Sequence, residues 1–424
     1  MVRKYVHNPF LIFSPFLIFY CYFITINKWP KLYGDEIRYW EFAKNLLHGF
    51  YSPPMPHINL WNGPGYPLFL VLFVALHVPA LYITLINALF LYLAIVFLHK
   101  SLLIVSNFKI ATIAGLLLAI YPNTQAILPI LYTEALTIFL ISIFAYIILI
   151  YNINQKKWYG VTAGLLLGYL VLTKIIFGYV ILIGLLICLI RLLFKKQWEL
   201  HLKPVLILFI AFMVTVPYLF YTYQLTNKLF YWGNSGGMSL YWMSSPYQNE
   251  YGDWKLPDLS NSQYPNLFPS AEVAAILKKN HNKELSFILK HNELEQDALF
   301  KKAAINNIKK SPLKFLSNYF SNCSRMLFNF PYSYSFQDAA IIRNILTGSL
   351  ILWGSVLALI ITFFNWRRLI TPVKFLLMLS GIYFLLSGAL SAYPRQLDVM
   401  MPILLFWMGY VAGNLKKVSL KFKE

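Results

Sequence analysis

Long apolar segments recur along the chain and predict membrane-spanning helices. A helix that crosses the hydrocarbon core of a bilayer needs about 20 predominantly apolar residues. The runs that approach or exceed this length occupy residues 9–26, 64–79, 81–105, 110–121, 126–151, 158–173, 175–194, 204–224, 341–364, 371–390 and 394–413. We therefore predict an all-α polytopic membrane protein with about eleven transmembrane or half-inserted helices.

Two polar stretches, residues 27–63 and 225–340, interrupt this apolar pattern. In the second stretch apolar residues recur at helical spacing, which predicts folded helices; they are Leu285, Ile288, Leu289, Leu299, Ile305 and Ile308. Pro312 then begins an amphipathic stretch, Leu313 to Phe330, that is suited to lying along a membrane surface. The predicted parts are an N-terminal transmembrane module that contains the 27–63 loop, an outer insert, and C-terminal transmembrane helices with a short basic tail, at 1–224, 225–340 and 341–424.

Basic residues in the short connecting loops orient the chain, because such residues are retained on the cytoplasmic side. They place both chain ends in the cytoplasm and both polar inserts outside, on one face. The residues that mark the inside are Arg3, Lys4, Lys156, Lys157, Lys195, Lys196, Lys203, Arg367, Arg368, Lys416 and Lys417. Successive spans must alternate between running outward and running inward. This alternation agrees with the basic loops only if one run between 64 and 121 does not cross the membrane. The runs 64–79 and 110–121 are both short, and the choice between them stays open.

Composition supports the membrane assignment and disfavours several other classes. The chain is 58% hydrophobic and 12% charged, whereas soluble domains average about 25% charged residues. Its formal charge of +20 arises mostly in loops, without the basic–aromatic alternation of a nucleic-acid-binding surface. Cys21 and Cys188 lie inside apolar runs and Cys323 stands alone, so neither a disulfide framework nor a zinc motif is predicted. The basic N-terminus and its apolar run lack a small-residue cleavage site, which favours an uncleaved first span.

Two adjacent carboxylates, Asp35 and Glu36, stand in "YGDEIRYWEFAKNLL" within the first polar stretch. Carboxylates favour the positive end of a helix dipole, so the pair can be no more than a solvated helix start. Facing a cleft, the same pair can act as a general base, because burial and a neighbouring like charge raise a carboxyl pKa toward neutrality. It can also hold a divalent cation through oxygen ligands.

The segment "HINLWNGPGYPLFL" leads from the first polar stretch back into the membrane. Its prolines and glycines predict an irregular segment, which also fits an ordinary helix N-terminus with proline in the first turn. In the functional interpretation, His57, Trp61 and Asn62 lie over the same outer cavity as the acidic pair.

Three further charged residues lie where an apolar span begins or ends. Glu134, in "YPNTQAILPILYTEAL", is predicted inside a span, where a carboxylate is costly unless it is paired. Lys174, in "LTKIIFG", is predicted at the outer face and can pair with a negative group. Arg395, in "LSAYPRQLDVMMPILLFW", either pairs locally with Asp398 or clamps a phosphate, which a planar guanidinium fits well. Together with the acidic pair, these residues suit a reaction between an anionic membrane-borne donor and an acceptor reached from outside.

The ordered set of motifs resembles the C-type (GT-C) membrane glycosyltransferases, in the branch of bacterial protein mannosyltransferase-like and aminoarabinose transferase-like enzymes. The matching segments are "GDEIRYWEFAKNLLHG", "GPGYPLFL", "YTEAL", "GLLLGYLVLTK", "KKSPLKFLSNYF" and "YPRQLDVMMP". The resemblance implies transfer of a sugar from a polyprenyl-phosphate carrier to a hydroxyl of a glycan, lipid or protein, with inversion at the anomeric carbon. It implies an integral protein of a bacterial inner membrane with its active site on the periplasmic face.

The resemblance also implies roles for particular residues. Asp35, with Glu36 beside it, matches the family's base toward the acceptor or its metal ligand. Glu134 matches a buried acidic residue, and the carrier phosphate is met by Lys174 and Arg395, with Tyr393 in the same motif. Acceptor recognition is expected from 225–340 or from another protein.

Elementary chemistry agrees with the implied reaction. A polyprenyl phosphate is a good leaving group, so no nucleotide is needed, and the chain has no GxGxxG loop. The alternative is a transporter or flippase for a lipid-linked glycan. Transporters usually show an internal repeat and polar sites near the bilayer midplane, whereas the polar residues here gather at one predicted face.

Overall fold

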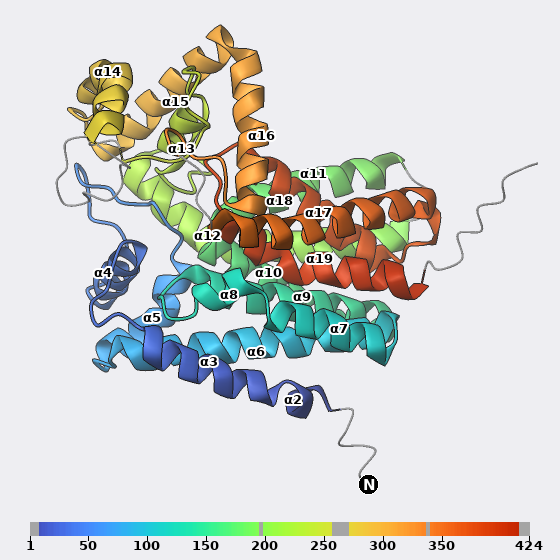
Figure 1. Cartoon of the computed structure of the whole chain (residues 1–424). Helices are drawn as coiled ribbons and strands as arrows, with labels where there is room; N and C mark the ends of the chain where they lie inside the picture. The colour runs from blue at the N-terminus through green and yellow to red at the C-terminus, as the bar shows by residue number, and fades with distance from the viewer. Residues whose placement is uncertain (1–7, 195–197, 257–270, 336–339, 415–424) are drawn as a thin grey trace, which may run out of the picture.

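The computed structural model of the protein describes residues 8–194, 198–256, 271–335 and 340–414. Within these ranges every regular element is a helix, which confirms the all-α prediction (Figure 1). The basic residues predicted inside at Arg3, Lys4, Lys195, Lys196, Lys416 and Lys417 lie outside the described residues.

Seven of the described helices are long and apolar enough to cross a membrane, and the chain is an integral membrane protein. They are α6 (Ala80–Val105), α9 (Thr133–Asn154), α11 (Ile176–Phe194), α12 (Trp198–Thr226), α17 (Ala340–Phe364), α18 (Thr371–Gly388) and α19 (Pro394–Asn414). The other apolar runs form α2 (Pro9–Ile12), α3 (Ser14–Asn27), α5 (Gly65–Ala75), α7 (Phe108–Ala119) and α10 (Lys157–Thr173). These helices are shorter, so the described residues do not confirm eleven crossings.

The run 64–79 is the one that turns back. Helix α5 is only 11 residues long, about 16 Å at 1.5 Å per residue, against a hydrocarbon core of about 30 Å. Its last residues, Val74 and Ala75, border a groove together with Trp40 and Lys44 of α4 (Asp35–Leu47). Helix α6 then starts at Ala80 at the same end of the bundle (Figure 1). The chain therefore enters and leaves α5 on the same side of the bundle. With this helix not crossing, the predicted alternation of outward and inward spans is consistent with the basic loops.

The run 126–151 begins later as a helix than the apolar pattern predicts. The chain first forms the short helix α8 (Pro122–Ala126), and then an irregular segment that contains Pro129 leads to α9. Proline lacks an N–H and clashes with the preceding helical turn. Side chains from elsewhere satisfy the freed backbone: Asn87 Nδ2 donates to the carbonyls of Leu128 and Ile130, at 3.0 and 2.9 Å. Irregular backbone is tolerated at this depth because protein partners replace water.

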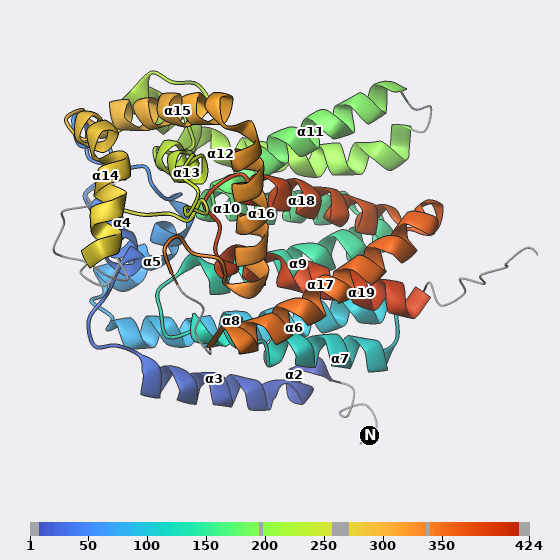
Figure 2. The ribbon, with the colours of Figure 1, turned by 45° about the horizontal axis from the view of Figure 1, so that its top comes forward.

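Both polar stretches lie at one end of the bundle, as the basic loops predict. Helices α13 (Gly236–Met243), α14 (Ala271–Ile288), α15 (Glu293–Lys310) and α16 (Pro312–Phe328) gather at the same end as α4 (Figure 2). Asn234 joins the two stretches, because its side chain accepts a hydrogen bond from Leu60 N at 3.0 Å and donates to Ile58 O at 2.9 Å. We call this end of the bundle the insert end.

The second polar stretch has its own small core, to which only some of the residues predicted from helical spacing contribute. Leu285 and Ile288 are buried there, but Ile305 is exposed. Glu250 is buried beside this core, and its carboxylate contacts His281 Nε2 at 2.8 Å. Burial tends to raise the pKa of Glu250, but the hydrogen bond and charge of His281 bring that pKa below its usual value.

Helix α16 is the predicted amphipathic helix. It begins at Pro312 and ends at Phe328, and in both views it runs across the membrane-spanning helices (Figures 1 and 2). Leu313, Leu316 and Phe320 are exposed along it. A helix with an apolar stripe in this orientation is suited to lie at the lipid–water interface.

Candidate active site

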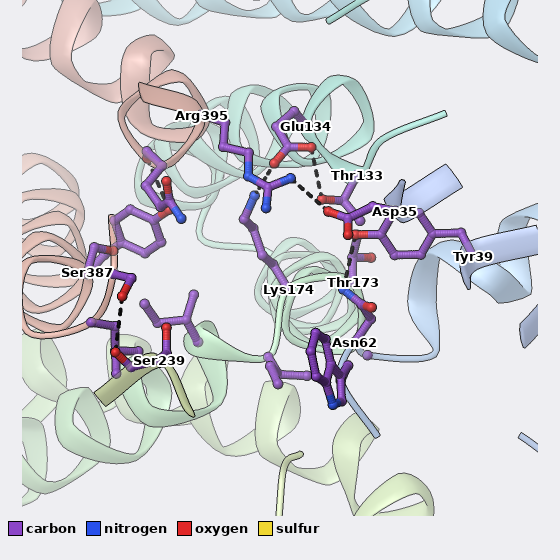
Figure 3. Close-up of a pocket in the computed structure, with 18 residues that line it drawn as sticks. Asp35, Tyr39, Asn62, Thr133, Glu134, Thr173, Lys174, Ser239, Ser387 and Arg395 are labelled. Carbon is purple, nitrogen blue, oxygen red and sulfur yellow. Dashed lines mark hydrogen bonds and ion pairs between the residues drawn. The ribbon is translucent and has the colours of Figure 1, made fainter. Parts of the chain in front are cut away.

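Two adjoining cavities lie where the insert end meets the membrane-spanning helices. The inner cavity, of about 190 Å³, reaches Glu134 and Lys174, and the outer cavity, of about 610 Å³, extends between the two polar stretches. The residues that line both cavities are Asp35, Trp61, Asn62, Ser239, Ser391, Arg395 and Gln396. Asp35 and Arg395 thus stand at the boundary between the two spaces. Figure 3 shows how both side chains lie in the inner cavity.

Asp35 is the first residue of α4 and holds two guanidinium groups. Its Oδ1 accepts from Arg38 Nη2 at 2.9 Å, and its Oδ2 accepts from Arg395 Nη1 at 2.9 Å. Gly34, with φ 59°, makes the turn into this helix in a region that disfavours other residues. Burial tends to raise the pKa of Asp35, but the charges of Arg395 and Arg38 bring that pKa below its usual value. Asp35 is therefore an ionised carboxylate at neutral pH.

Glu134 and Lys174 form a second ion pair on the wall of the inner cavity. Lys174 Nζ donates to Glu134 Oε1 at 2.7 Å, and both side chains are largely buried (Figure 3). Lys174 follows the last residue of α10, where a cation is favoured by the helix dipole. Gly63 packs against the end of α10 so closely that a Cβ there would lie 2.0 Å from Leu172 O. The glycine allows the returning loop to press against the end of α10, just before Lys174.

Several helix N-termini point at the cavities. Helices α4, α9, α11 and α19 start at Asp35, Thr133, Ile176 and Pro394, and each of these residues lines one or both cavities. A helix N-terminus carries about half a positive charge and unpaired N–H groups, so together they favour an anion. Arg395, the second residue of α19, adds a cation where the dipole alone disfavours one. The site is thus electrostatically arranged to receive a negative group.

The structure does not bring Glu36 into the site. Its carboxylate instead contacts Lys28 Nζ at 2.6 Å and accepts hydrogen bonds from Leu131 N at 2.8 Å and Tyr33 N at 3.1 Å. Consecutive helical residues project about 100° apart, so Asp35 and Glu36 face different partners. Glu36 lines neither cavity and instead fixes the irregular segment before Glu134.

The other residues predicted at the site divide into two groups. Trp61 and Asn62 line both cavities, and Tyr393 lines the outer one, donating from its hydroxyl to Trp254 O at 3.1 Å. His57 lines neither cavity: it is exposed, with Nδ1 3.5 Å from Glu293 Oε1. Arg395 pairs with Asp35, so the alternative of a local pair with Asp398 is wrong.

The geometry does not favour a metal site made by the acidic pair. Asp35 pairs with the side chain of Arg395 and Glu36 pairs with that of Lys28, so the two carboxylates do not face a common cavity. In the described part of the chain no group of three or more His, Cys, Asp or Glu side chains is placed to hold a metal ion. These residues do not fit a bound metal ion in this arrangement.

Sequence reasoning missed several residues of the site. Arg38 stands three residues after Asp35, a spacing at which helical side chains meet, and this signal was available. Trp254 and Tyr332 reach the outer cavity from separate parts of the second polar stretch, and no local sequence pattern predicts that they line it. Arg325 is fully buried beside the cavity wall, on a helix whose pattern indicates only a surface role.

Comparison with known proteins supports the fold. The sequence matches no protein-family model, and no curated protein is significantly similar to it. The archaeal oligosaccharyltransferase AglB from Archaeoglobus fulgidus, solved with an inhibitory peptide and a dolichol-phosphate, aligns with a TM-score of 0.51 at 16% identity, over 96% of this chain and 50% of that one. A second structure of that oligosaccharyltransferase, tethered to an acceptor peptide, gives a TM-score of 0.50 at 15% identity, over 94% and 49% of the two chains. ArnT from Cupriavidus metallidurans, bound to undecaprenyl phosphate, gives 0.42 at 13%, over 94% and 77%.

The chain spans about half the length of the oligosaccharyltransferase that it resembles. AglB is a GT-C glycosyltransferase, and nearly the whole of this chain superimposes on part of it. The protein therefore has a GT-C-type fold, which confirms the fold expected from the sequence motifs.

Proposed function

We propose that the protein is a glycosyltransferase that moves a sugar from a polyprenyl-phosphate carrier to an acceptor hydroxyl. The observation that carries this proposal is the Asp35–Arg395 pair, which joins a carboxylate to a guanidinium at the boundary of two cavities. The reaction needs a base and a phosphate-binding cation close together. AglB, whose fold this chain shares, has been solved with a dolichol-phosphate, and this supports a polyprenyl-phosphate donor.

In the proposed reaction, the acceptor hydroxyl attacks the anomeric carbon from the outer cavity. Asp35 takes the hydroxyl proton as the new carbon–oxygen bond forms, and the bond from the anomeric carbon to the phosphate oxygen breaks. The electron pair leaves with the polyprenyl phosphate, whose added charge is stabilised by Arg395, Lys174 and the helix N-termini. A single displacement inverts the anomeric carbon, and the proton on Asp35 then passes to water.

Arg395 links donor binding to the strength of the base. In the structure its charge and hydrogen bond lower the pKa of Asp35. A guanidinium has five N–H donors, so Arg395 can turn toward a phosphate while it stays near Asp35. As the phosphate takes part of this interaction, the basicity of Asp35 rises. The carboxylate thus becomes a better base when the donor is present.

The Glu134–Lys174 pair holds the second cation in place until the donor arrives. Glu134 accepts a hydrogen bond from Lys174 Nζ at 2.7 Å, and this contact directs the ammonium at the inner cavity. Thr133 supports Glu134, because its Oγ1 donates to Glu134 Oε2 at 3.3 Å. Lys174 is then a point charge for the phosphate, beside the fork of Arg395.

We place the site on the non-cytoplasmic face, in a bacterial inner membrane. Lys156 lies between α9 and α10, and Lys157 is the first residue of α10; Arg367 and Arg368 lie between α17 and α18. Both places are at the end opposite the insert end (Figure 1). Retention of such residues in the cytoplasm directs the cavities outward. Among the described residues the ion pairs gather at the insert end and not along the bundle, which favours transfer over the alternative of a transporter.

The proposal is tested by comparing envelope glycans and glycolipids from cells with and without the gene, using mass spectrometry. We expect one sugar residue to disappear without the gene and to return with the wild-type gene supplied in trans. The missing sugar identifies the donor, and the glycan or lipid that lacks it identifies the acceptor. Unchanged glycans, combined with a lipid-linked glycan that accumulates on the cytoplasmic face, would support transport and contradict transfer.

Replacing Arg395 with alanine is expected to weaken use of the donor. Hydrogen bonds to charged groups contribute about 1.5–3 kcal/mol, so donor KM should rise by about 10- to 100-fold. Initial rates at varied polyprenyl-phosphate-sugar concentration measure this effect. Arg343→Ala, at an exposed position of α17, is the matched control. An unchanged donor KM with impaired acceptor use would contradict the phosphate-binding role.

A further inference from the structure

We infer that the outer cavity binds an uncharged oligosaccharide as the acceptor. This inference rests on the proposed sugar transfer and adds the chemical class of the molecule that receives the sugar. It comes from the described side chains that line the cavity, which combine aromatic rings with hydroxyl and amide groups and include very few aliphatic side chains.

The apolar part of the outer cavity is aromatic. Its rings are Tyr33, Trp61, Tyr132, Trp254, Tyr332 and Tyr393, whereas Leu256 and Pro394 are the aliphatic residues among its described lining. An aromatic face is electron-rich, and it matches the weakly positive C–H groups on the flat side of a sugar ring. The rings thus provide stacking surfaces for a carbohydrate.

A second groove of the protein has a different lining and serves as a comparison. The groove of about 560 Å³ between α4 and the α5–α6 turn is bordered mainly by aliphatic side chains, among them Leu32, Leu47, Val74 and Val78. Acyl chains have no flat polar face, and aliphatic walls suit them. The outer cavity differs from this groove in composition, which argues against an acyl chain as its occupant.

The aromatic rings are held in place before any ligand binds. Trp61 and Trp254 lie edge to face, with centroids 6.3 Å apart and an interplanar angle of 87°. Arg38 covers one side of Trp61, 4.7 Å from the ring centroid. Tyr332 and Tyr393 lie 6.0 Å apart, and the Tyr393 hydroxyl is bonded to Trp254 O. Rings fixed in this way lose little conformational entropy on binding.

The polar groups of the outer cavity suit neutral hydroxyls. They include Ser235, Asn329 and Gln396, whose side chains both donate and accept hydrogen bonds. The cations of the described lining, Arg38 and Arg395, both bind Asp35. Because the proposed transfer assigns Arg395 to the donor phosphate, Arg38 is the cation of the described lining that remains for an acidic acceptor, and this favours an uncharged sugar chain.

The outer cavity lies beside the proposed base. Asp35 borders both cavities, so a hydroxyl of a sugar stacked in the outer cavity can reach the base while the donor lies in the inner one. The outer cavity has about 610 Å³, within the usual range of about 300–1,000 Å³ for ligand sites. This space is sufficient for the end of a chain of sugars.

The inference is tested by binding to the full-length protein in lipid nanodiscs. The probes are neutral gluco- and manno-tetraoses, an uncharged hexapeptide and a short-chain phosphatidylglycerol, each followed by saturation-transfer NMR. We expect a tetraose to bind and Trp254→Ala to weaken its affinity at least tenfold, while Trp254→Phe stays within about threefold. Trp29→Ala, at an exposed tryptophan outside both cavities, is the matched control.

Tyr332→Leu removes a ring that lines the outer cavity from a different segment of the chain. Its tetraose affinity tests the inference even if Trp254→Ala fails to fold. Equal tetraose affinity in Tyr332→Leu and Trp29→Ala would overturn the inference, as would binding of the peptide or the phospholipid alone. Binding of undecaprenyl phosphate, measured on the same samples, tests the proposed transfer separately. Its absence would contradict the donor assignment, whereas absence of tetraose binding would contradict the acceptor assignment.

Discussion

Replacing Asp35 with asparagine is expected to reduce sugar transfer by about 10²- to 10⁴-fold, the usual contribution of general base catalysis. The amide has nearly the same shape as the carboxylate, and its oxygen can still accept a hydrogen bond from Arg38 or Arg395. It cannot take a proton from the acceptor. The loss should therefore appear in kcat and not as weaker donor binding, while thermal stability changes little.

Initial transfer rates at saturating donor, together with the Tm in detergent, measure this effect. Glu41→Gln is the matched control, because Glu41 is an exposed carboxylate of the same helix that pairs only with Lys44 among the described residues. We expect that control to transfer sugar at the wild-type rate. Transfer by Asp35→Asn at a comparable rate would remove the base assignment and leave Asp35 as a partner of the two arginines.

The helices of the bundle were predictable because burial in lipid leaves a strong local signal. A span must be continuously apolar, and it must satisfy its own backbone hydrogen bonds. The boundaries were harder: composition alone places the start of a helix at 126, whereas Pro129 and side chains from other helices keep the chain irregular until Thr133. Hydrophobicity likewise does not distinguish α5, which turns back, from a helix that crosses.

The charged residues of the site were predictable for a related reason. Glu134, Lys174 and Arg395 interrupt or border apolar runs, where an unpaired charge is costly, so each needs a partner or a function. The structure pairs Glu134 with Lys174, and Arg395 with Asp35. The partner of each residue could not be predicted from residue type, because each pair joins segments that are far apart in the chain.

The rest of the site depends on orientation and on long-range packing. Asp35 and Glu36 are adjacent in sequence, but one lines the cavities and the other supports the segment before Glu134. The rotation of α4 about its axis, set by packing against its neighbours, decides which carboxylate faces the cavities and which supports the segment before Glu134. Trp254 reaches the outer cavity through the fold of the second polar stretch, and no spacing in the sequence encodes this contact.

Arg325 is the residue through which that stretch holds the site together. Its Nε donates to Pro331 O at 2.8 Å, its Nη1 to Ala392 O at 3.2 Å, and its Nη2 to Tyr251 O at 2.7 Å. These carbonyls belong to three segments, and the one that contains Ala392 leads directly into α19 and Arg395. Arg325 itself is completely buried. One planar guanidinium thus fixes the position of the proposed phosphate-binding residue from α16.

Replacing Arg325 with methionine is expected to lower both stability and activity. Methionine retains much of the packing volume but leaves these carbonyls without their donor. Each unpaired buried polar group costs about 1–3 kcal/mol, so the free energy of unfolding should fall by several kcal/mol. Thermal denaturation measures the loss, and Lys309→Met, at an exposed position of α15, is the control.

Arg325→Lys separates the positional role from simple loss of charge. Lysine keeps the charge, but a single ammonium cannot reproduce the three directions of the guanidinium fork. We expect this variant to recover part of the stability while donor KM stays raised, because the segment before Arg395 remains poorly held. If Arg325→Lys restored donor KM completely, the charge alone would be sufficient, and Arg325 would not position Arg395 through its hydrogen bonds.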